Sequence, residues 1–323
     1  MEVLLKSYRL NWGLRMQTSL LAKLSVDLLL PKDSLDYLIR SAPHRYKVYQ
    51  VPKRSGSGMR TIAQPAKEVK KLQYWVMENI FCNFNVHPSA IAYVTGKNIR
   101  TNAAPHANHP YALKLDFKDF FPSIKAEDFL QYAKENEKLQ LQEADLRRLA
   151  RILFWCPRSA SEHRLSIGAP SSPYLSNAMM YKFDIDISQY CALQEVIYTR
   201  YADDMTFSMV DKTMRSRVLE KVLDVLRMLP FPKLEINSEK TVFCSKAHRR
   251  MVTGLILTND GNVSLGRDRK RNIRAQLHYF VSGRLQDSLR PHLRGMLAFA
   301  RDIEPAFIRR MEQRYGKNVI SSI

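Results

Sequence analysis

The chain has 323 residues, of which 45% are hydrophobic, an ordinary share for a folded protein that divides into two or three subdomains. Its 51 lysine and arginine residues against 31 acidic residues give a formal net charge of +20, which favours a polyanionic partner over a merely basic surface. With no apolar run of about 18 residues, no signal-peptide core and four scattered cysteines, we expect a cytoplasmic protein without a membrane span, disulfides or a zinc site.

The N-terminal third predicts a helix, a hairpin and a second helix. Apolar spacing favours a helix over 25–40, and β-rich runs favour paired strands over 46–51 and 59–62. The loop Lys53-Arg54-Ser55-Gly56-Ser57-Gly58 between them combines glycine with cations, which suits phosphate, although a flexible turn has the same composition. Pro65 is expected to open the second helix.

A strand is predicted over 111–116, where Leu113 and Leu115 share one face and Lys114 and Asp116 share the other. Four helices are predicted after it, over 126–135, 142–154, 172–190 and 214–229. Within the third, Asp184 and Asp186 are expected on a solvated face, with Asp184 also a candidate to support a nearby site.

Tyr201-Ala202-Asp203-Asp204 lies between two β-rich runs, which predicts a hairpin with both aspartates at its turn. Aspartate favours turns, so a plain solvated turn is one interpretation. Adjacent carboxylates repel each other, however, and a divalent cation is the usual reason to keep them ionised. Together with Asp116 they form the carboxylate set that two-metal phosphoryl transfer requires, and oxygen ligands suit Mg²⁺.

The C-terminal sixty residues predict helices with basic faces. Residues 264–323 hold 13 lysine and arginine residues against 5 acidic ones. We expect the cations clustered at one helix start to contact the polyanionic partner. These cations are Arg267, Arg269, Lys270, Arg271 and Arg274.

Five motifs, in order across about residues 45–260, resemble those of reverse transcriptases. They are Arg60-Thr61-Ile62-Ala63-Gln64-Pro65, Leu115-Asp116-Phe117-Lys118-Asp119-Phe120-Phe121, Gly168-Ala169-Pro170-Ser171-Ser172-Pro173, Tyr201-Ala202-Asp203-Asp204 and Ile236-Asn237-Ser238-Glu239-Lys240-Thr241. The chain departs from the pattern at Ile167, where the family usually has glutamine, and this puts contacts near the incoming nucleotide in doubt. Two further segments, Asn102-Ala103-Ala104-Pro105-His106 and Val252-Thr253-Gly254, resemble the NAxxH and VTG signatures of bacterial retron reverse transcriptases.

The resemblance implies an α+β right-hand polymerase. Its fingers would comprise 1–112 with a contribution from 140–175, its antiparallel palm 113–258 and its helical thumb 259–323. Such an enzyme is an RNA-directed DNA polymerase, a nucleotidyltransferase that uses dNTPs.

The resemblance also implies roles for single residues. Asp116, Asp203 and Asp204 would bind two Mg²⁺ ions, with the Phe117 carbonyl as a further ligand. Lys240 resembles a lysine proposed to protonate pyrophosphate, although a surface lysine is an equal interpretation. Arg60 would contact the triphosphate, and Phe121 would exclude a 2′-hydroxyl. Gly168, Ala169 and Pro170 would hold the template and the nucleotide. The candidates for RNA recognition are the basic thumb and Asn102, His106, Val252, Thr253 and Gly254.

A retron enzyme would bind a structured noncoding RNA, prime DNA synthesis from an RNA 2′-hydroxyl, and yield a branched RNA–DNA product in anti-phage defence, with an effector protein from the same operon. Two alternatives stay open. One is an intron-type or diversity-generating reverse transcriptase that uses a 3′-hydroxyl primer. The other is a non-catalytic RNA-binding scaffold, against which the three intact carboxylates argue.

Overall fold

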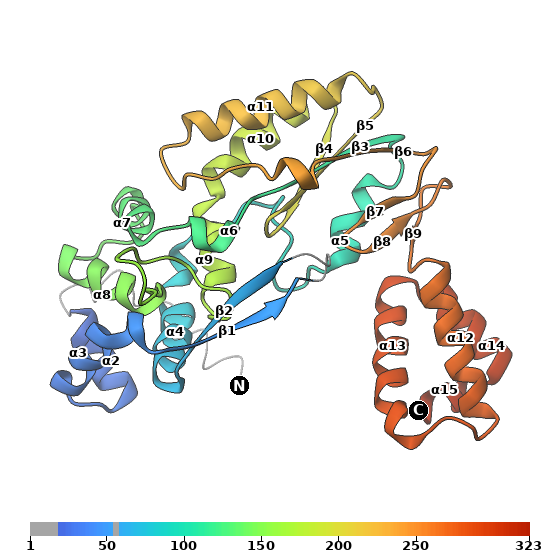
Figure 1. The fold of residues 1–323 in the computed structure, drawn as a ribbon, viewed down its shortest axis with the longest axis horizontal. Coiled ribbons are helices and arrows are strands. Elements are labelled where there is room, and N and C mark those ends of the chain that lie inside the picture. The colour runs from blue at the N-terminus through green and yellow to red at the C-terminus, as the bar shows by residue number, and fades with distance from the viewer. Residues whose placement is uncertain (1–18, 54–57) are drawn as a thin grey trace. The chain divides into compact units, whose positions relative to one another are not determined.

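The computed structural model describes residues 19–53 and 58–323 (Figure 1). Four residues of the predicted phosphate-binding loop, Arg54-Ser55-Gly56-Ser57, lie outside the described residues. None of the described helices combines the length and apolar character needed to cross a membrane. The chain forms two compact units. Unit 1 comprises residues 1–93, 117–188 and 221–237, and unit 2 comprises residues 94–116, 189–220 and 238–323.

Unit 1 is mainly helical and contains one two-stranded hairpin. The first helix among the described residues, α2 (Leu20–Leu28), is capped by the Ser19 hydroxyl and ends where Leu29 adopts a left-handed backbone. The next helix, α3 (Lys32–Ser41), starts after Pro31. The single helix predicted over 25–40 is therefore wrong: a left-handed residue and a proline divide it, because neither continues a helix.

The predicted hairpin is confirmed as strands β1 (Tyr46–Pro52) and β2 (Met59–Pro65), which pair antiparallel in the register Tyr46 to Pro65. Pro65 ends β2 and does not open a helix. Helix α4 (Lys67–Asn79) instead starts after Ala66. It buries Val69, Leu72 and Val76, and Ile80 directly after it is buried as well.

Further α-helices of unit 1 are α6 (Phe120–Ser123), α7 (Ala126–Glu135), α8 (Glu143–Leu153), α9 (Ser172–Met179) and α10 (Tyr181–Leu193), the last of which continues into unit 2. The C-terminal part of α11 (Met214–Met228), which begins in unit 2, also belongs to unit 1. The helix predicted over 172–190 is thus two helices that separate at Met180. Asp186 is exposed as expected, but Asp184 is fully buried, so the solvated face predicted for it is wrong.

Unit 2 contains a four-stranded antiparallel sheet with the strand order β4-β5-β3-β6. Its strands are β3 (Tyr111–Asp116), β4 (Ile197–Tyr201), β5 (Asp204–Met209) and β6 (Val242–Ser245). Leu113 and Leu115 are buried on one face, while Lys114 and Asp116 lie on the other, as their alternation predicted. Helix α11 (Met214–Met228) follows β5.

A second, smaller sheet in unit 2 was not predicted. It consists of β7 (Arg250–Val252), β8 (Leu255–Leu257) and β9 (Val263–Ser264). Four helices follow, drawn in orange to red in Figure 1: α12 (Arg267–Val281), α13 (Arg290–Ile303), α14 (Pro305–Tyr315) and α15 (Lys317–Ser321). Leu255 and Leu257 of the sheet share one hydrophobic core with Leu277, Leu293 and Phe307 of these helices.

A buried histidine ties the segment before β3 to the larger sheet. Short helices α5 (Ile99–Ala103) and η4 (Ala104–His106) end at His106. The two ring nitrogens of His106 lie 2.8 Å from the hydroxyls of Ser208 on β5 and Thr199 on β4. Burial, with a smaller contribution from the charge of His109, lowers the pKa of His106 to about 3. The ring is therefore neutral, with one nitrogen donating and the other accepting.

The buried histidine predicts a loss of stability in mild acid. Between pH 6.5 and 3 the unfolded chain binds a proton at His106 and the native protein does not, so stability falls as pH falls through this range. At pH 5 the cost is about 2 kcal/mol. His106→Gln should remove this contribution, whereas His248→Gln, which alters an exposed histidine, should keep it. Chemical denaturation at pH 7 and pH 5 measures both, and equal pH dependence in wild type and His106→Gln would contradict the assignment.

Candidate active site

The three predicted carboxylates come together in unit 2. Asp116 at the end of β3 lies directly opposite Asp204 at the start of β5. Tyr201 pairs with Asp204, which leaves Ala202 and Asp203 as a two-residue turn. Ala202 adopts a φ of 59°, a left-handed conformation that costs a non-glycine residue about 1–3 kcal/mol. The predicted hairpin is therefore confirmed, and its strained turn projects two aspartates beside a third.

Electrostatic repulsion at this turn is visible in the pKa of Asp204. Burial, followed by the charges of Asp203 and Asp116, raises the pKa of Asp204 to about 6, and the nearby Lys114 only partly opposes this rise. The carboxylates are thus short of positive charge. A cation placed among them would relieve the repulsion and restore the ionised form.

Lys240 supplies one positive charge to the site. Its Nζ donates a hydrogen bond to Asp116 Oδ1 at 2.7 Å, and the Asp116 side chain is only 7% exposed. Burial alone would lower the pKa of Lys240, but the hydrogen bond to Asp116 and the carboxylate charges outweigh burial and raise it. Lys240 is therefore a charged partner of Asp116 rather than an unengaged surface lysine.

Arg200 supports the turn and was missed by the sequence analysis. Its side chain is fully buried on β4, and its Nη1 donates to the Ala202 carbonyl at 3.0 Å. This bond holds the strained residue that precedes Asp203. The sequence contains a signal for this role, because Arg200 stands inside a run of β-branched and aromatic residues, where a buried charge is rarely tolerated without a partner.

The oxygen-only donor set suits a hard divalent cation such as those that act in phosphoryl transfer. Among the described residues, no group of three or more histidine, cysteine or acidic side chains is already closed at metal-binding spacing. Asp116 instead contacts Lys240. The chemistry of the residues therefore fits a divalent metal ion.

Unit 1 brings together the candidates for template and nucleotide contact. Phe121, Gly168, Ala169 and Pro170 line one pocket of about 290 Å³. Gly168 has a φ of 122°, and a Cβ there would lie 3.0 Å from the Ala63 carbonyl oxygen, so the loop requires glycine. The pocket thus brings Phe121 together with the loop at Gly168, which lies 47 positions later in the chain.

The neighbouring phenylalanines Phe120 and Phe121 have different surroundings. Phe120 is 3% exposed and stacks on buried Phe117 at a ring distance of 5.5 Å. Phe121 is only partly buried and faces the pocket. Arg60 is exposed on β2. These positions keep Phe121 and Arg60 available to a ligand and place Phe117 and Phe120 in the core.

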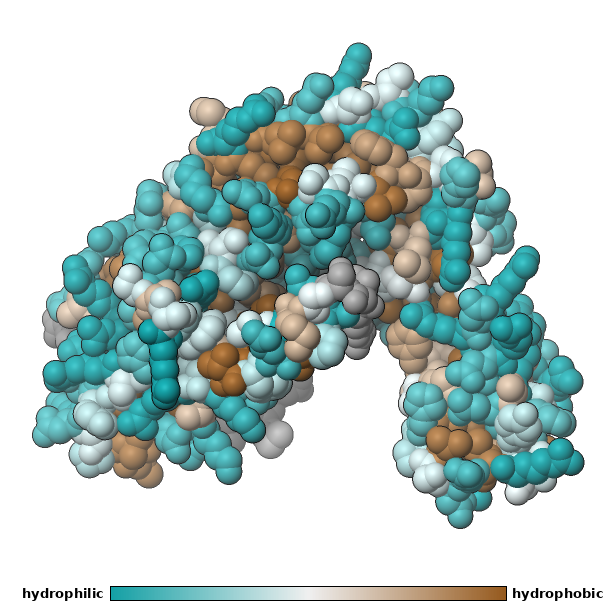
Figure 2. All heavy atoms as spheres, viewed as in Figure 1, coloured by the Kyte–Doolittle hydropathy of each residue, from teal (hydrophilic) through white to brown (hydrophobic). Residues whose placement is uncertain are grey.

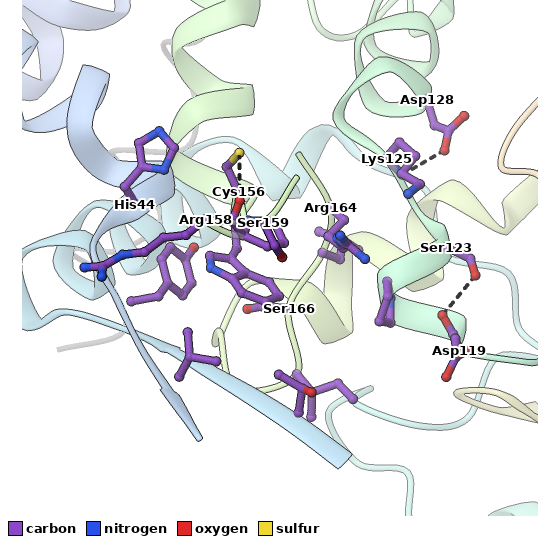
Figure 3. Close-up of a pocket in the computed structure, with 18 of the residues that line it drawn as sticks. His44, Asp119, Ser123, Lys125, Asp128, Cys156, Arg158, Ser159, Arg164 and Ser166 are labelled. Atoms are coloured by element: carbon purple, nitrogen blue, oxygen red, sulfur yellow. Dashed lines mark hydrogen bonds between the residues drawn. The ribbon is translucent and has the colours of Figure 1, made fainter. Parts of the chain in front are cut away.

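A larger pocket of about 1100 Å³ in unit 1 is lined by cations that sequence analysis did not select. Figure 3 shows Arg158 and Arg164 on the loop after α8 and Lys125 at the start of α7. Ser166 and Ile167 line both this pocket and the smaller one. The Ser166 hydroxyl is buried without a partner among the described residues. Ile167 places an apolar side chain where the family usually has an amide, while its carbonyl accepts from Ala63 at 2.9 Å.

The two signature segments meet in unit 2. Thr253 and Gly254, with φ of 45° and 80°, form the tight turn between β7 and β8, a conformation that matches strand twist in hairpins. Asn102 Nδ2 donates to Thr253 Oγ1 at 3.5 Å. Asn102, His106 and Val252 are each at most 2% exposed. Their side chains therefore cannot contact RNA directly in this structure, because burial commits them to holding the segments together.

The predicted basic cluster of α12 divides into two groups. Arg269 donates to the Gly254 carbonyl at 2.7 Å, and Lys270 pairs with Glu304 at 2.6 Å, so both have structural partners. Arg267, Arg271 and Arg274 are exposed, and their spacing of four and three residues places them on one helix face. Figure 2 shows the visible face of α12–α15 as mostly hydrophilic. The exposed group remains available to a polyanion.

Comparison with known proteins agrees with this geometry. Residues 51–257 match the family described as reverse transcriptase (RNA-dependent DNA polymerase). The retron Ec83 reverse transcriptase of Escherichia coli is 42% identical over 291 residues, covering 89% of this chain and 93% of the relative. The retron Ec86 reverse transcriptase of the same organism is 33% identical over 298 residues, covering 90% and 88%.

One solved structure with partial similarity is telomerase from Candida albicans in complex with a telomeric RNA fragment. The TM-score is 0.46 and the sequence identity 12%, and the match covers 85% of this chain and 56% of that one. A foamy viral protease–reverse transcriptase in complex with double-stranded DNA has a TM-score of 0.45, 14% identity, and coverage of 86% and 43%. The sequence relatives, which extend over nearly the whole chain, identify the family. The chain belongs to the retron reverse transcriptases, RNA-directed DNA polymerases with the predicted α+β right-hand fold that use divalent metal ions.

Proposed function

We propose that this reverse transcriptase copies a structured noncoding RNA into single-stranded DNA that stays joined to the RNA, priming from an RNA 2′-hydroxyl, with Mg²⁺ as its metal and dNTPs as substrates. The observation that carries the proposal is the placement of Asp116 opposite Asp204, beside Asp203, in a chain 42% identical to a retron enzyme. The same relationship supports a role in anti-phage defence with an effector protein. The expected division into fingers, palm and thumb also stays a proposal.

Asp116, Asp203 and Asp204, with the Phe117 carbonyl, are the residues proposed to hold two Mg²⁺ ions. When bound, magnesium supplies Lewis-acid stabilisation of the attacking hydroxyl and of the pyrophosphate oxygens. Arg200 keeps the turn in place through the Ala202 carbonyl. Lys240 neutralises Asp116 before the ligands arrive. Its ammonium group is then available to donate a proton to pyrophosphate.

The pockets of unit 1 are proposed to receive the nucleotide and the template. Phe121 places an aromatic wall where a 2′-hydroxyl would lie, so the site accepts dNTPs in preference to rNTPs. The triphosphate would meet Arg60 and the cations around the larger pocket. These cations are Lys125, Arg158, Arg164 and Lys233. Fixed cations stabilise a triphosphate by charge-assisted hydrogen bonds.

The metal site can be tested through Asp203. Asp203→Asn removes one ligand charge and should lower the rate of DNA synthesis by about 10³-fold or more while the fold and RNA binding persist. Asp186→Asn removes an exposed carboxylate of the same kind and should leave the rate unchanged. Primer extension on an annealed RNA template measures both. A folded Asp203→Asn protein that extends primers at the wild-type rate would contradict the assignment of Asp203 as a metal ligand.

The contact between Lys240 and Asp116 predicts competition with metal. Lys240→Met should leave the buried Asp116 charge uncompensated, which lowers the stability of the metal-free protein and raises its affinity for Mn²⁺ several-fold. Lys118→Met, which removes an exposed lysine, should leave Mn²⁺ affinity unchanged. The signal of free Mn²⁺ in electron paramagnetic resonance gives both affinities. Equal affinity in wild type and Lys240→Met would show that Lys240 does not compete.

The role of Phe121 can be separated from that of its neighbour. Phe121→Ala should open space in the pocket and raise rNTP use relative to dNTP use, measured as the ratio of kcat/KM values. Phe120→Ala should instead lower stability by about 3–5 kcal/mol with little change in this ratio, because Phe120 is a core residue. If Phe120 controls the ratio, the assignment of the sugar-facing position is wrong.

A further inference from the structure

Unit 2 contains a pocket of about 520 Å³ that none of the roles above uses. Its walls come from α5, the β8–β9 hairpin, α12 and the junction of α13 with α14. Segments separated by about two hundred residues in the chain therefore meet around one hollow. The volume lies within the range of about 300–1,000 Å³ that is usual for small-ligand sites.

The charge of the pocket is predominantly positive. Arg100 and Arg309 line it, and neither forms an ion pair with any residue that the structure describes. Lys270 and Arg310 also line it and pair with Glu304 at 2.6 and 3.5 Å. The other carboxylate of the wall, Asp260, accepts from the Asn262 side-chain amide within its own turn. Two arginines are thus left for an anion from outside.

The walls of the pocket are tied to one another. Glu304 Oε2 accepts from the Leu265 amide and the Ser264 hydroxyl, each at 3.1 Å, which joins the end of β9 to the start of α14. Asn98, the cap of α5, donates to Asp302 at the end of α13 at 2.9 Å. These bonds hold the cations in place before any ligand arrives, so binding does not have to order them.

The burial of the signature residues explains the exposure of Arg100. Asn102 faces inward toward the turn at Thr253, and the Thr253 hydroxyl donates to the Ile99 carbonyl at 3.3 Å. With its inner face fixed in this way, α5 leaves Arg100 at the pocket. The two signature segments therefore do not line the pocket themselves, but their contacts fix the helix that carries Arg100.

We propose that this pocket binds the phosphodiester backbone of RNA, with Arg100 and Arg309 as its phosphate contacts. The proposal rests on the proposed function, which gives the enzyme a structured RNA partner, and it adds a site separate from the exposed face of α12. Guanidinium groups bind phosphate oxygens in a bidentate manner, and the +20 net charge favours association with a polyanion. The contact provides affinity and position, while discrimination between RNA sequences requires contacts to bases.

The test compares two charge-matched double variants of the full chain. Arg100→Gln with Arg309→Gln removes the unpaired guanidinium groups of the pocket. Arg284→Gln with Arg314→Gln removes two exposed arginines of unit 2 that do not line it. Binding of a fluorescent synthetic RNA hairpin is measured across a salt series. The pocket variant should bind about tenfold more weakly at low salt, with a salt slope reduced by about one to two, and the control should resemble wild type.

A second measurement detects the contact without mutation. Photocrosslinking of the same hairpin, carrying an aryl azide on backbone phosphorothioates, to the wild-type protein, followed by peptide mapping, should recover the peptides that contain Arg100 and Arg309. Equal weakening in both double variants, or wild-type affinity in the pocket variant together with no crosslink at these peptides, overturns the proposal. Neither readout involves DNA synthesis. A protein that binds the hairpin through the pocket and never extends a primer would instead overturn the proposed function alone.

Discussion

Repulsion among three carboxylates is the constraint on which the rest of unit 2 depends. Asp116 and Asp204 face each other on neighbouring strands, and Asp203 lies in the adjoining turn. Holding these charges together costs energy unless cations balance them. Lys240, in the segment before β6, and Lys114, on β3, provide part of that positive charge. Arg200 holds the turn through its hydrogen bond to the Ala202 carbonyl. The sheet is thus a frame that keeps negative charge concentrated for a metal.

The same unit shows how buried polar groups join distant segments. His106 links α5 and η4 to β4 and β5, Asn102 links α5 to the β7–β8 turn, and Arg250 donates to the carbonyls of Ala107 and Thr258. Each of these side chains is buried, so each would be costly if left without a partner. Asn102 and His106 of the first signature segment are therefore fixed by their internal partners.

Local sequence signals predicted the parts of the structure that local contacts determine. Alternation of apolar and polar residues predicted β3 and β5. Apolar spacing predicted α7 with the same bounds that the structure shows. The carboxylate site followed because strand ends and a hairpin turn are local features. The β7–β9 sheet was missed because its strands are two or three residues long, too short to show a period.

Contacts between distant segments explain the remaining errors. The burial of Asp184, Asn102 and His106 depends on partners or neighbours far along the chain, so a polar residue that looked solvated or RNA-facing proved to be internal. The cations of the two larger pockets come from several segments each, and no spacing in the sequence groups them. Composition predicted an excess of positive charge, but only the fold shows where that charge is left without an internal partner.

The turn at Thr253 and Gly254 has a consequence for how the protein can evolve. Gly254 has a φ of 80°, and a Cβ there would lie 3.4 Å from Nη2 of Arg269, whose Nη1 donates to the Gly254 carbonyl. A residue with a Cβ would be strained at this positive φ, whereas the end of the flexible Arg269 side chain could move aside. Substitution of Gly254 is therefore disfavoured by the backbone conformation of the turn, and a lineage that lost the glycine would relieve that strain most readily by changing the length of the turn.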